Sequence, residues 1–324
     1  MNKTMQLLKN LWITFRPHFF FVSGAAGLSG MAFAYLDPPL WRILATFIIC
    51  FFSYGLIQAL CDTFDLETDR INAPFRPMVS GELPVKTVVL VLSVTLLGVA
   101  VIFFLMNPIL LGVQLIALVF SLTYNGMKRI PHAGPLWNGI IVATLPYIGA
   151  FGISEARTVA DLPPVIHFNA LIVCFVYAGF VLTGYFKDVT GDSQTGYRTA
   201  PVVYGIRKAR WQVLPYSLFA AGGFVLYYWN RFGLWEKAAP EAKVIYAILG
   251  IVGVTLLVLS NIILIRDPSE KNSYGALLWY TRGMVLTFLS PVALGYWHVA
   301  LGTAFVFMIS MEYFLLKTRR TGQA

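Results

Sequence analysis

Apolar runs of about 20 residues recur from one end of the 324-residue chain to the other. A helix of 20 residues is roughly 30 Å long, which is the thickness of the hydrocarbon core of a bilayer. The composition agrees, because 58% of the residues are hydrophobic and only 12% are charged, far from the values of a soluble domain. We therefore predict an all-α fold, a polytopic membrane helical bundle with nine or ten transmembrane helices.

The predicted spans follow one another without a long polar insertion, so we expect a single domain over 1–324. They lie at roughly 18–36, 41–62, 85–106, 108–126, 134–153, 165–187, 209–230, 243–265, 276–298 and 300–317. The segment 274–317 could form one long kinked helix or two short ones, and we favour two, with His298 marking a turn between them. Glycines at 24, 27 and 30 in the first span predict close helix packing.

The basic residues indicate how the chain is oriented. With ten spans and a cytoplasmic N-terminus, 19 of the 24 Lys and Arg residues fall in inner segments and 5 in outer ones. Nine spans would weaken this bias to 16 against 8. The positive-inside rule therefore favours ten spans. The net charge of +9 is spread over short loops, which is typical of topology determinants, so we expect no nucleic-acid partner.

An acidic segment follows the second predicted span, with the sequence QALCDTFDLETDRINAPFRPMVSG from Gln58 to Gly81. Asp62, Asp65 and Asp69 are spaced i, i+3 and i+7, so one continuous helix would place all three carboxylates on one face. Three like charges at a membrane boundary repel one another and favour a bound cation.

A second acidic segment, TGYFKDVTGDSQTGYRTAPVVYG, carries Asp188 and Asp192 at i and i+4 after another span. Each segment alone is compatible with ordinary solvated loop residues. Both, however, lie at the same predicted membrane face, and both are followed by an arginine, a proline and a glycine. The pair therefore indicates a site for a metal-bound phosphate or diphosphate.

These motifs resemble the UbiA superfamily of intramembrane prenyltransferases. The resemblance is carried by DxxDxxxD, by INxPxRPxxSG after it, and by KDVxGDxxxGxRTxPVxxG. The first motif is most similar to the chlorophyll-synthase branch. Weaker similarity extends from Arg16-Pro17 to the eighth span. One residue departs from the pattern, because Cys61 stands where the family usually has asparagine.

The resemblance implies a Mg²⁺-dependent prenyltransferase with a central cavity, the lipid bilayer around it, and a prenyl diphosphate and a lipophilic acceptor as substrates. Pyrophosphate would be released at an active site facing the cytoplasm. The implied metal ligands, which are also catalytic, are Asp62, Asp65, Asp69, Asp188 and Asp192. The implied substrate-binding residues are Lys128, Arg76, Tyr124, Arg198, Arg16 and Gln58, of which Lys128 is also catalytic. Without the resemblance, topology anchoring is the favoured explanation of Lys128.

Two other functions stay open. A terpene cyclase of the UbiA type would use the same metal site without an acceptor. A secondary transporter would use intramembrane acids as a relay, but these acids gather at one membrane face instead of the midplane. The sequence contains no Ser/His/Asp triad, cysteine pair or glycine-rich phosphate loop that would favour another class of enzyme.

The cysteines, the histidines and one acidic residue in the last apolar run lie outside these motifs. Cys50, Cys61 and Cys174 lie in or beside apolar runs, so no disulfide framework is expected. The four histidines lie near predicted span ends or in loops, where an interfacial position is the default. Glu312 stands inside the last apolar run, and we expect its side chain to snorkel toward Lys317.

Overall fold

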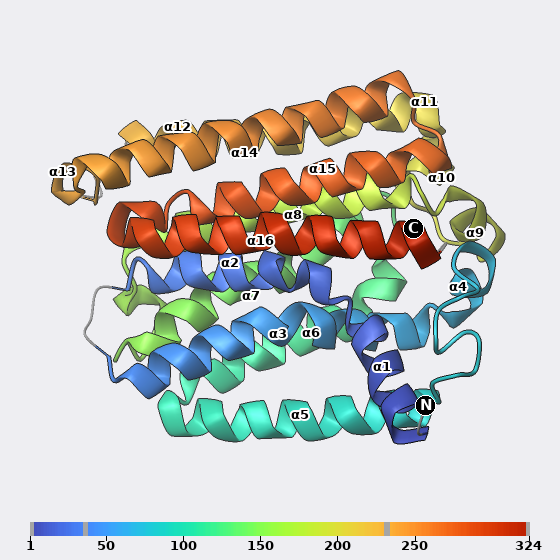
Figure 1. Ribbon diagram of the computed structural model, residues 1–324, viewed down its shortest axis with the longest axis horizontal. Helices are drawn as coiled ribbons and strands as arrows, with labels where there is room; N and C mark the ends of the chain where they lie inside the picture. The colour runs from blue at the N-terminus through green and yellow to red at the C-terminus, as the bar shows by residue number, and fades with distance from the viewer. Residues whose placement is uncertain (1–2, 35–37, 230–233, 322–324) are drawn as a thin grey trace.

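The computed structural model describes residues 3–34, 38–229 and 234–321, and these residues contain helices but no strand. The prediction of an all-α fold is therefore confirmed over this part of the chain. Most of the long helices run side by side along the longest axis of the molecule (Figure 1). The α-helices are α1 Lys3–Phe15, α2 Phe20–Met31, α3 Leu40–Phe64, α4 Leu66–Asn72, α5 Val85–Met106, α6 Ile109–Met127, α7 Ala133–Ile153, α8 Pro164–Tyr185, α9 Val189–Gln194, α10 Ala200–Tyr204, α11 Ile206–Ala209, α12 Leu214–Trp229, α13 Leu234–Lys237, α14 Pro240–Arg266, α15 Glu270–Leu289 and α16 Ala293–Thr321. Short 3₁₀ helices occur at η1 Pro17–Phe19, η2 Val159–Asp161 and η3 Arg210–Val213.

Seven helices in the described residues are long and apolar enough to cross a membrane: α3, α5, α6, α7, α8, α14 and the part of α16 up to Tyr313. The three remaining predicted spans correspond to α2 and α12, of 12 and 16 residues, and to α15, which carries Glu270, Lys271 and Arg282. The protein is thus a membrane helical bundle, and the total of nine or ten spans stays a prediction.

The centre of the bundle is built around α7 and α8, whose side chains are mostly buried. Helix α2 packs closely against α7. A Cβ atom placed on Gly30 would lie 2.0 Å from the carbonyl oxygen of Pro146, so the backbones can approach only because glycine has no side chain. The expectation that the glycines of this span serve packing is confirmed at this contact.

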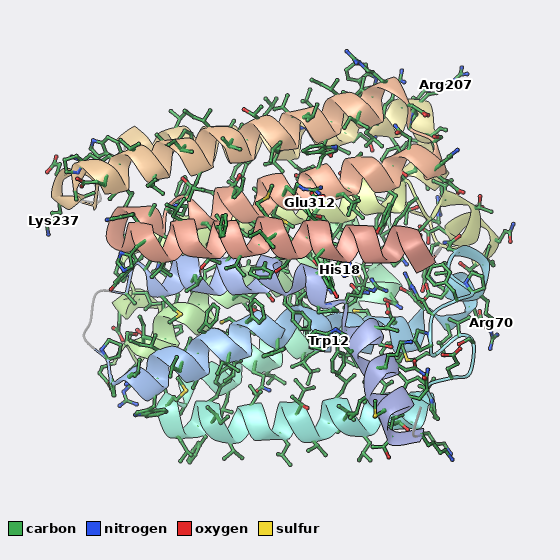
Figure 2. All side chains as sticks on the ribbon, in the orientation of Figure 1. Trp12, His18, Arg70, Arg207, Lys237 and Glu312 are labelled. Carbon is green, nitrogen blue, oxygen red and sulfur yellow. The ribbon has the colours of Figure 1, made fainter. Side chains whose placement is uncertain are left out.

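The short helices α4, α9, α10 and α11 gather at one end of the bundle, and α13 lies at the opposite end (Figure 1). Helix α1 lies at the first of these ends and runs across the direction of the long helices. Arg70 and Arg207 mark this end in Figure 2, whereas Lys237 lies at the other. Both acidic segments follow helices that finish here, as the sequence predicts.

The C-terminal region forms two helices, as favoured, but the break differs from the prediction. It lies at 290–292, and His298 is inside α16, which has a kink at Tyr296. The Glu312 carboxylate pairs with Arg282 of α15, whereas the side chain of Lys317, toward which we expected it to reach, lies outside the described part of the chain. Glu312 lies partway along α16 (Figure 2). A carboxylate on a membrane helix is stabilised by a cation on the facing helix. Arg282 is buried within α15, and it is therefore not one of the loop cations as the count of basic residues assumed.

Candidate active site

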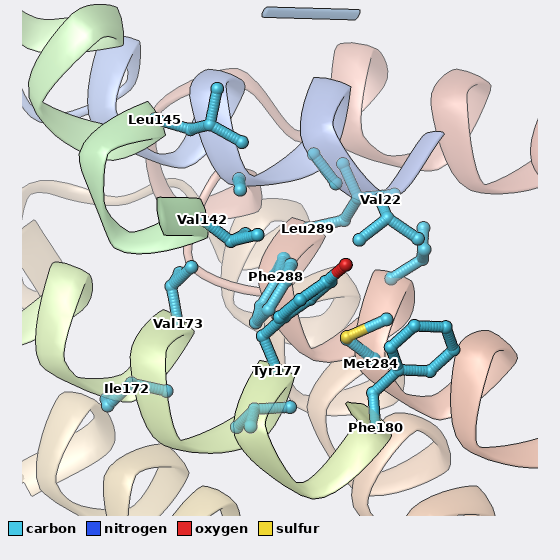
Figure 3. Close-up of a cluster of buried hydrophobic side chains, with 14 of the residues drawn as sticks. Val22, Val142, Leu145, Ile172, Val173, Tyr177, Phe180, Met284, Phe288 and Leu289 are labelled. Carbon is cyan, nitrogen blue, oxygen red and sulfur yellow. The ribbon is translucent and has the colours of Figure 1, made fainter. Parts of the chain in front are cut away.

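A cavity of about 600 Å³ lies inside the bundle and has a polar end and an apolar end. Its polar end is lined by both acidic segments and by Lys128, and its apolar part by α2, α3, α5, α6, α7 and α8. Figure 3 shows a cluster of buried apolar side chains that includes the lining residues Val22, Tyr177 and Phe180. The Tyr177 hydroxyl points toward Val22, and Phe180 lies beside Met284, which does not line the cavity. A cavity of this size suits an organic ligand, and its two ends suit a molecule with a charged head and an apolar tail.

Asp62 is buried near the end of α3 and receives three charge-assisted or polar hydrogen bonds. Arg16 Nη2 donates to Oδ2 at 2.7 Å and to Oδ1 at 3.0 Å, and Gln58 Nε2 donates to Oδ1 at 2.7 Å. Gln58 lies one helical turn before Asp62, so α3 itself supplies that contact. The structure thus brings Arg16 and Gln58, two of the predicted substrate-binding residues, to one predicted metal ligand.

The helix breaks at Asp65, which separates α3 from α4 with φ −97° and ψ 10°. The expectation that one continuous helix presents all three aspartates on one face is therefore wrong. Asp65 turns toward α6, where Asn125 Nδ2 lies 2.9 Å and Lys128 Nζ 3.3 Å from its carboxylate oxygens. The hydroxyl of Tyr197, from the second acidic segment, donates to Asp65 Oδ1 at 2.7 Å.

Arg76 joins the other two aspartates of the first segment. Its guanidinium pairs with Asp69 of α4, and its Nη1 lies 3.7 Å from Asp62 Oδ1. Asp62 and Asp69 therefore share one cation although the helix is interrupted between them.

The second acidic segment presents one half-exposed and one buried carboxylate. Asp188 pairs with Lys187, whose Nζ lies 2.7 Å from Oδ2. Asp192 is fully buried, accepts a hydrogen bond from Thr199 Oγ1 at 3.2 Å, and lies 3.8 Å from Lys128 Nζ. Because Lys128 also contacts Asp65, one ammonium group connects the two segments.

Asn72 forms a second connection through the backbone. Its Oδ1 accepts from the N–H of Gly191 at 3.0 Å, and its Nδ2 donates to the carbonyl oxygen of Asp188 at 3.3 Å. Asn72 belongs to the INxPxRP motif of the first segment. The two acidic segments are therefore held together by an uncharged side chain as well as by Lys128.

Burial shapes the electrostatics of the cluster. It raises the pKa of the Asp69 carboxyl to about 6, although Arg76 opposes the shift. Burial likewise raises the pKa of Asp192 to about 6, against the effect of Lys128. Burial would lower the pKa of Lys128, but the Asp65 and Asp192 carboxylates outweigh it and raise that pKa. At Asp69 and Asp192 the effect of burial on the pKa is thus larger than that of the neighbouring cation.

The remaining predicted residues are placed as follows. Tyr124 lines the cavity, with its hydroxyl 3.2 Å from that of Tyr185. Arg198 has an exposed side chain that does not line the cavity, although its backbone N–H donates to the Lys128 carbonyl at 3.0 Å. Cys61 is buried in the cavity wall. The interfacial expectation for His18 is wrong, because its ring lines the cavity beside Phe19.

The residues present suit Mg²⁺, which prefers oxygen ligands. Two buried oxygens at this site, Oδ1 of the Asp192 carboxylate and Oδ1 of the Asn125 amide, have no hydrogen-bond partner among the described residues. No three acidic, histidine or cysteine side chains within 3–34, 38–229 and 234–321 already converge as a metal-binding group. The carboxylates contact cationic side chains instead, so an ion would have to replace some of these contacts.

Comparison with known proteins decides the family. The profile of the UbiA prenyltransferase family matches residues 22–279, which is most of the chain. The chain belongs to the UbiA prenyltransferase family. It is an integral membrane prenyltransferase, and the match covers both acidic segments and Lys128 but ends before α16.

Two relatives and two solved structures show how far the similarity extends. The digeranylgeranylglyceryl phosphate synthase of Pyrococcus abyssi is 27% identical over 197 residues, 60% of this chain and 68% of that protein. The bacteriochlorophyll synthase 34 kDa chain of Chloroflexus aurantiacus is 28% identical over 293 residues, 87% of this chain and 88% of that one. A UbiA homologue from Aeropyrum pernix superimposes with a TM-score of 0.68 at 18% identity, covering 90% of this chain and 98% of that one. A UbiA homologue from Archaeoglobus fulgidus, bound to GPP and Mg²⁺, gives 0.61 at 19% identity, covering 89% and 99%. The structures share the fold of this chain.

Proposed function

We propose that this UbiA-family prenyltransferase moves an isoprenoid chain from a prenyl diphosphate to an aromatic or other lipophilic acceptor, with Mg²⁺ required and pyrophosphate released. The observation that carries the proposal is the position of Lys128, which contacts Asp65 and Asp192 at the polar end of an apolar cavity. The GPP and Mg²⁺ bound by the Archaeoglobus fulgidus homologue support it.

The carboxylates would hold two Mg²⁺ ions, one at Asp62, Asp65 and Asp69 and the other at Asp188 and Asp192. Bound there, the ions would supply positive charge to the departing diphosphate. The chain's own cations act beside them. Lys128 and Arg76 would contact diphosphate oxygens, assisted by Arg16, Tyr124 and Gln58, with Arg198 a weaker candidate. These cations now pair with the carboxylates, so when Mg²⁺ binds there they would turn from the carboxylates to the diphosphate oxygens and stabilise the leaving group.

The apolar cavity would protect the allylic carbocation that remains when the diphosphate leaves. Tyr54, Tyr177 and Phe180 line it, and aromatic faces stabilise positive charge without forming a bond. The surrounding helices exclude bulk water, which would otherwise capture the cation. The acceptor's nucleophilic atom then forms the new bond to the prenyl carbon and loses its proton.

The polar end of the cavity is proposed to face the cytoplasm, where isoprenoid diphosphates are made. The positive-inside bias supports this orientation. So does the arrangement of the chain, because α1 and the last turns of α16 lie at the same end as the acidic segments (Figure 1).

Product analysis tests the proposal. Membranes containing the protein would be incubated with Mg²⁺ and several prenyl diphosphates, with and without an extract that contains acceptors, and Asp65→Asn would serve as the inactive control. A prenylated product and pyrophosphate that appear only with the extract support prenyl transfer to an acceptor. A hydrocarbon or alcohol formed without the extract would instead establish the cyclase alternative, and no consumption of any prenyl diphosphate would refute both.

A further inference from the structure

The apolar part of the cavity ends at a definite depth. On α6 the deepest residue that lines it is Gln114, which precedes Lys128 by 14 residues. At the helical rise of 1.5 Å per residue, this separation is about 21 Å. On α3 and α5 the lining also reaches deep positions, at Ile49 and Phe103. These three residues mark the far end of the cavity from Lys128.

Phe103 lines this end and is almost completely buried. Behind it, Met106 and Leu110 are buried core residues that do not line the cavity. Gln114 is the polar residue at this end, and its Nε2 donates to the Leu96 carbonyl at 3.0 Å and so connects α6 to α5. The end of the cavity is thus formed by α3, α5 and α6 together, with Ile49 and Phe103 as its apolar lining.

The backing of this end is held by polar contacts at the far side of the bundle. Asn107 Nδ2 donates to the carbonyl of Ala156 at 2.8 Å. The buried Arg42 donates to the carbonyls of Gly152 and Ser154, both at 3.0 Å. These bonds fix the turns between α5 and α6 and after α7, so Phe103 cannot easily move outward to admit a longer molecule.

We propose that Phe103 limits the prenyl chain to about four isoprene units, so that a geranylgeranyl chain is the longest that fits fully in the cavity. An extended isoprene unit has four main-chain bonds and spans about one helical turn, roughly 5.4 Å, so about four units fill the 21 Å. This inference rests on the proposed prenyl diphosphate substrate, and it adds the chain length and the residue that sets it.

Binding competition tests the length limit without an acceptor. Purified protein with Mg²⁺ would bind radiolabelled geranylgeranyl diphosphate, displaced by unlabelled diphosphates of two, three, four and five isoprene units. We expect affinity to rise with each unit up to four and to fall at five. Phe103→Ala should improve the five-unit affinity relative to the four-unit one at least about tenfold, because it removes the barrier.

Ala117→Phe provides the opposite test, since Ala117 lines the cavity on α6 nearer to Lys128. This substitution should weaken the binding of the four-unit diphosphate at least about tenfold while leaving the affinity for the two-unit diphosphate unchanged. Phe104→Ala is the matched control, because Phe104 is an exposed neighbour on the same helix. Phe103→Leu, a smaller change, tests the same barrier if the alanine variant does not fold.

The outcomes separate this inference from the proposed function. Length preferences that stay the same in the Phe103 and Ala117 variants would overturn the limit while leaving prenyl transfer intact, as would tighter binding of the five-unit chain by the unchanged protein. Variants that shift the preference as expected support the limit even if no transfer product is found. Failure of every prenyl diphosphate to bind would overturn both.

Discussion

The backbone N–H of Gly191 donates to Asn72 Oδ1 at 3.0 Å, so two segments more than a hundred residues apart in sequence meet at one hydrogen bond. A Cβ atom on residue 191 would lie 2.4 Å from Asn72 Nδ2 and 2.5 Å from Asn72 Oδ1. The contact therefore requires glycine at this position, and it fixes the distance between the two acidic segments.

Gly191→Ala should lower turnover at least about tenfold, because Asn72 must move away and the two groups of carboxylates then shift relative to each other. Gly126→Ala is the control, since a Cβ atom there meets nothing within 4 Å. Turnover would be measured with the active prenyl diphosphate found by product analysis. Equal rates for both alanine variants would show that the contact does not position the site.

Removal of Mg²⁺ should abolish activity, because the clustered carboxylates need a divalent cation before a diphosphate can approach. Asp65→Asn and Asp188→Asn should each reduce turnover at least about a hundredfold, the scale for loss of one electrostatic stabiliser. Rates would be measured with Mg²⁺ and with EDTA. Near-normal turnover of either variant, or of the unchanged protein in EDTA, contradicts the two-metal proposal.

Lys128→Ala should weaken the binding of a non-hydrolysable diphosphate analogue at least about tenfold, since a hydrogen bond between charged groups contributes about 1.5–3 kcal/mol. Arg129→Ala is a matched control, because Arg129 is the exposed neighbour with the same effect on topology. Titration gives the affinities, and thermal unfolding checks that each variant folds. If both variants bind the analogue normally, Lys128 serves only as a membrane anchor.

Cys61→Ser and Cys61→Asn should both remain active, because a neutral thiol is a poor ligand for so hard a cation as Mg²⁺. Cys61→Asn should also lower the Mg²⁺ concentration needed for half-maximal rate, since an amide oxygen can coordinate the ion or orient its water. Magnesium titrations of the three proteins measure this. Inactivity of Cys61→Ser with intact diphosphate binding would instead assign the thiol a chemical role.

The C-terminus should lie in the cytoplasm, on the same side as the acidic segments. A reporter that is active only outside the cytoplasm, fused after residue 324, should therefore give no signal. The same reporter fused at the α13 end of the bundle, after Lys237, should be active and serves as the positive control. An external signal from the C-terminal fusion would favour nine spans.

Sequence reasoning predicted the helical bundle and the charged residues that meet at the cavity because both leave strong local signals. Long apolar runs identify spans, and aspartates at helical spacing are rare beside them. It did not predict the break in the helix at Asp65, where the carboxylate contacts Asn125 and Lys128 at the end of α6. Asn72, Asn125 and Tyr197 were missed for a related reason. They are uncharged, and their importance appears only when distant segments meet, although Asn72 and Tyr197 do lie inside the two motifs.

Sequence distance gave no sign of the partner that the structure shows for Glu312. Arg282 of α15 is 30 residues away along the chain but lies across the helix pair and forms an ion pair with Glu312. His18 was misplaced. Its position near the start of a span indicated an interfacial residue, whereas the turn at η1 directs its ring into the cavity.

Arg16, which donates both hydrogen bonds to the buried Asp62, does so from a left-handed backbone conformation with φ 51° and ψ 64°. Non-glycine residues adopt such conformations at a cost of about 1–3 kcal/mol. Glycine would relax the backbone at this position but would remove the cation nearest to the buried Asp62 carboxylate. Breaking a buried ion pair costs about 3–5 kcal/mol, so the ion pair offsets the strain, and a selection of variants for thermal resistance alone would tend to retain the strained arginine.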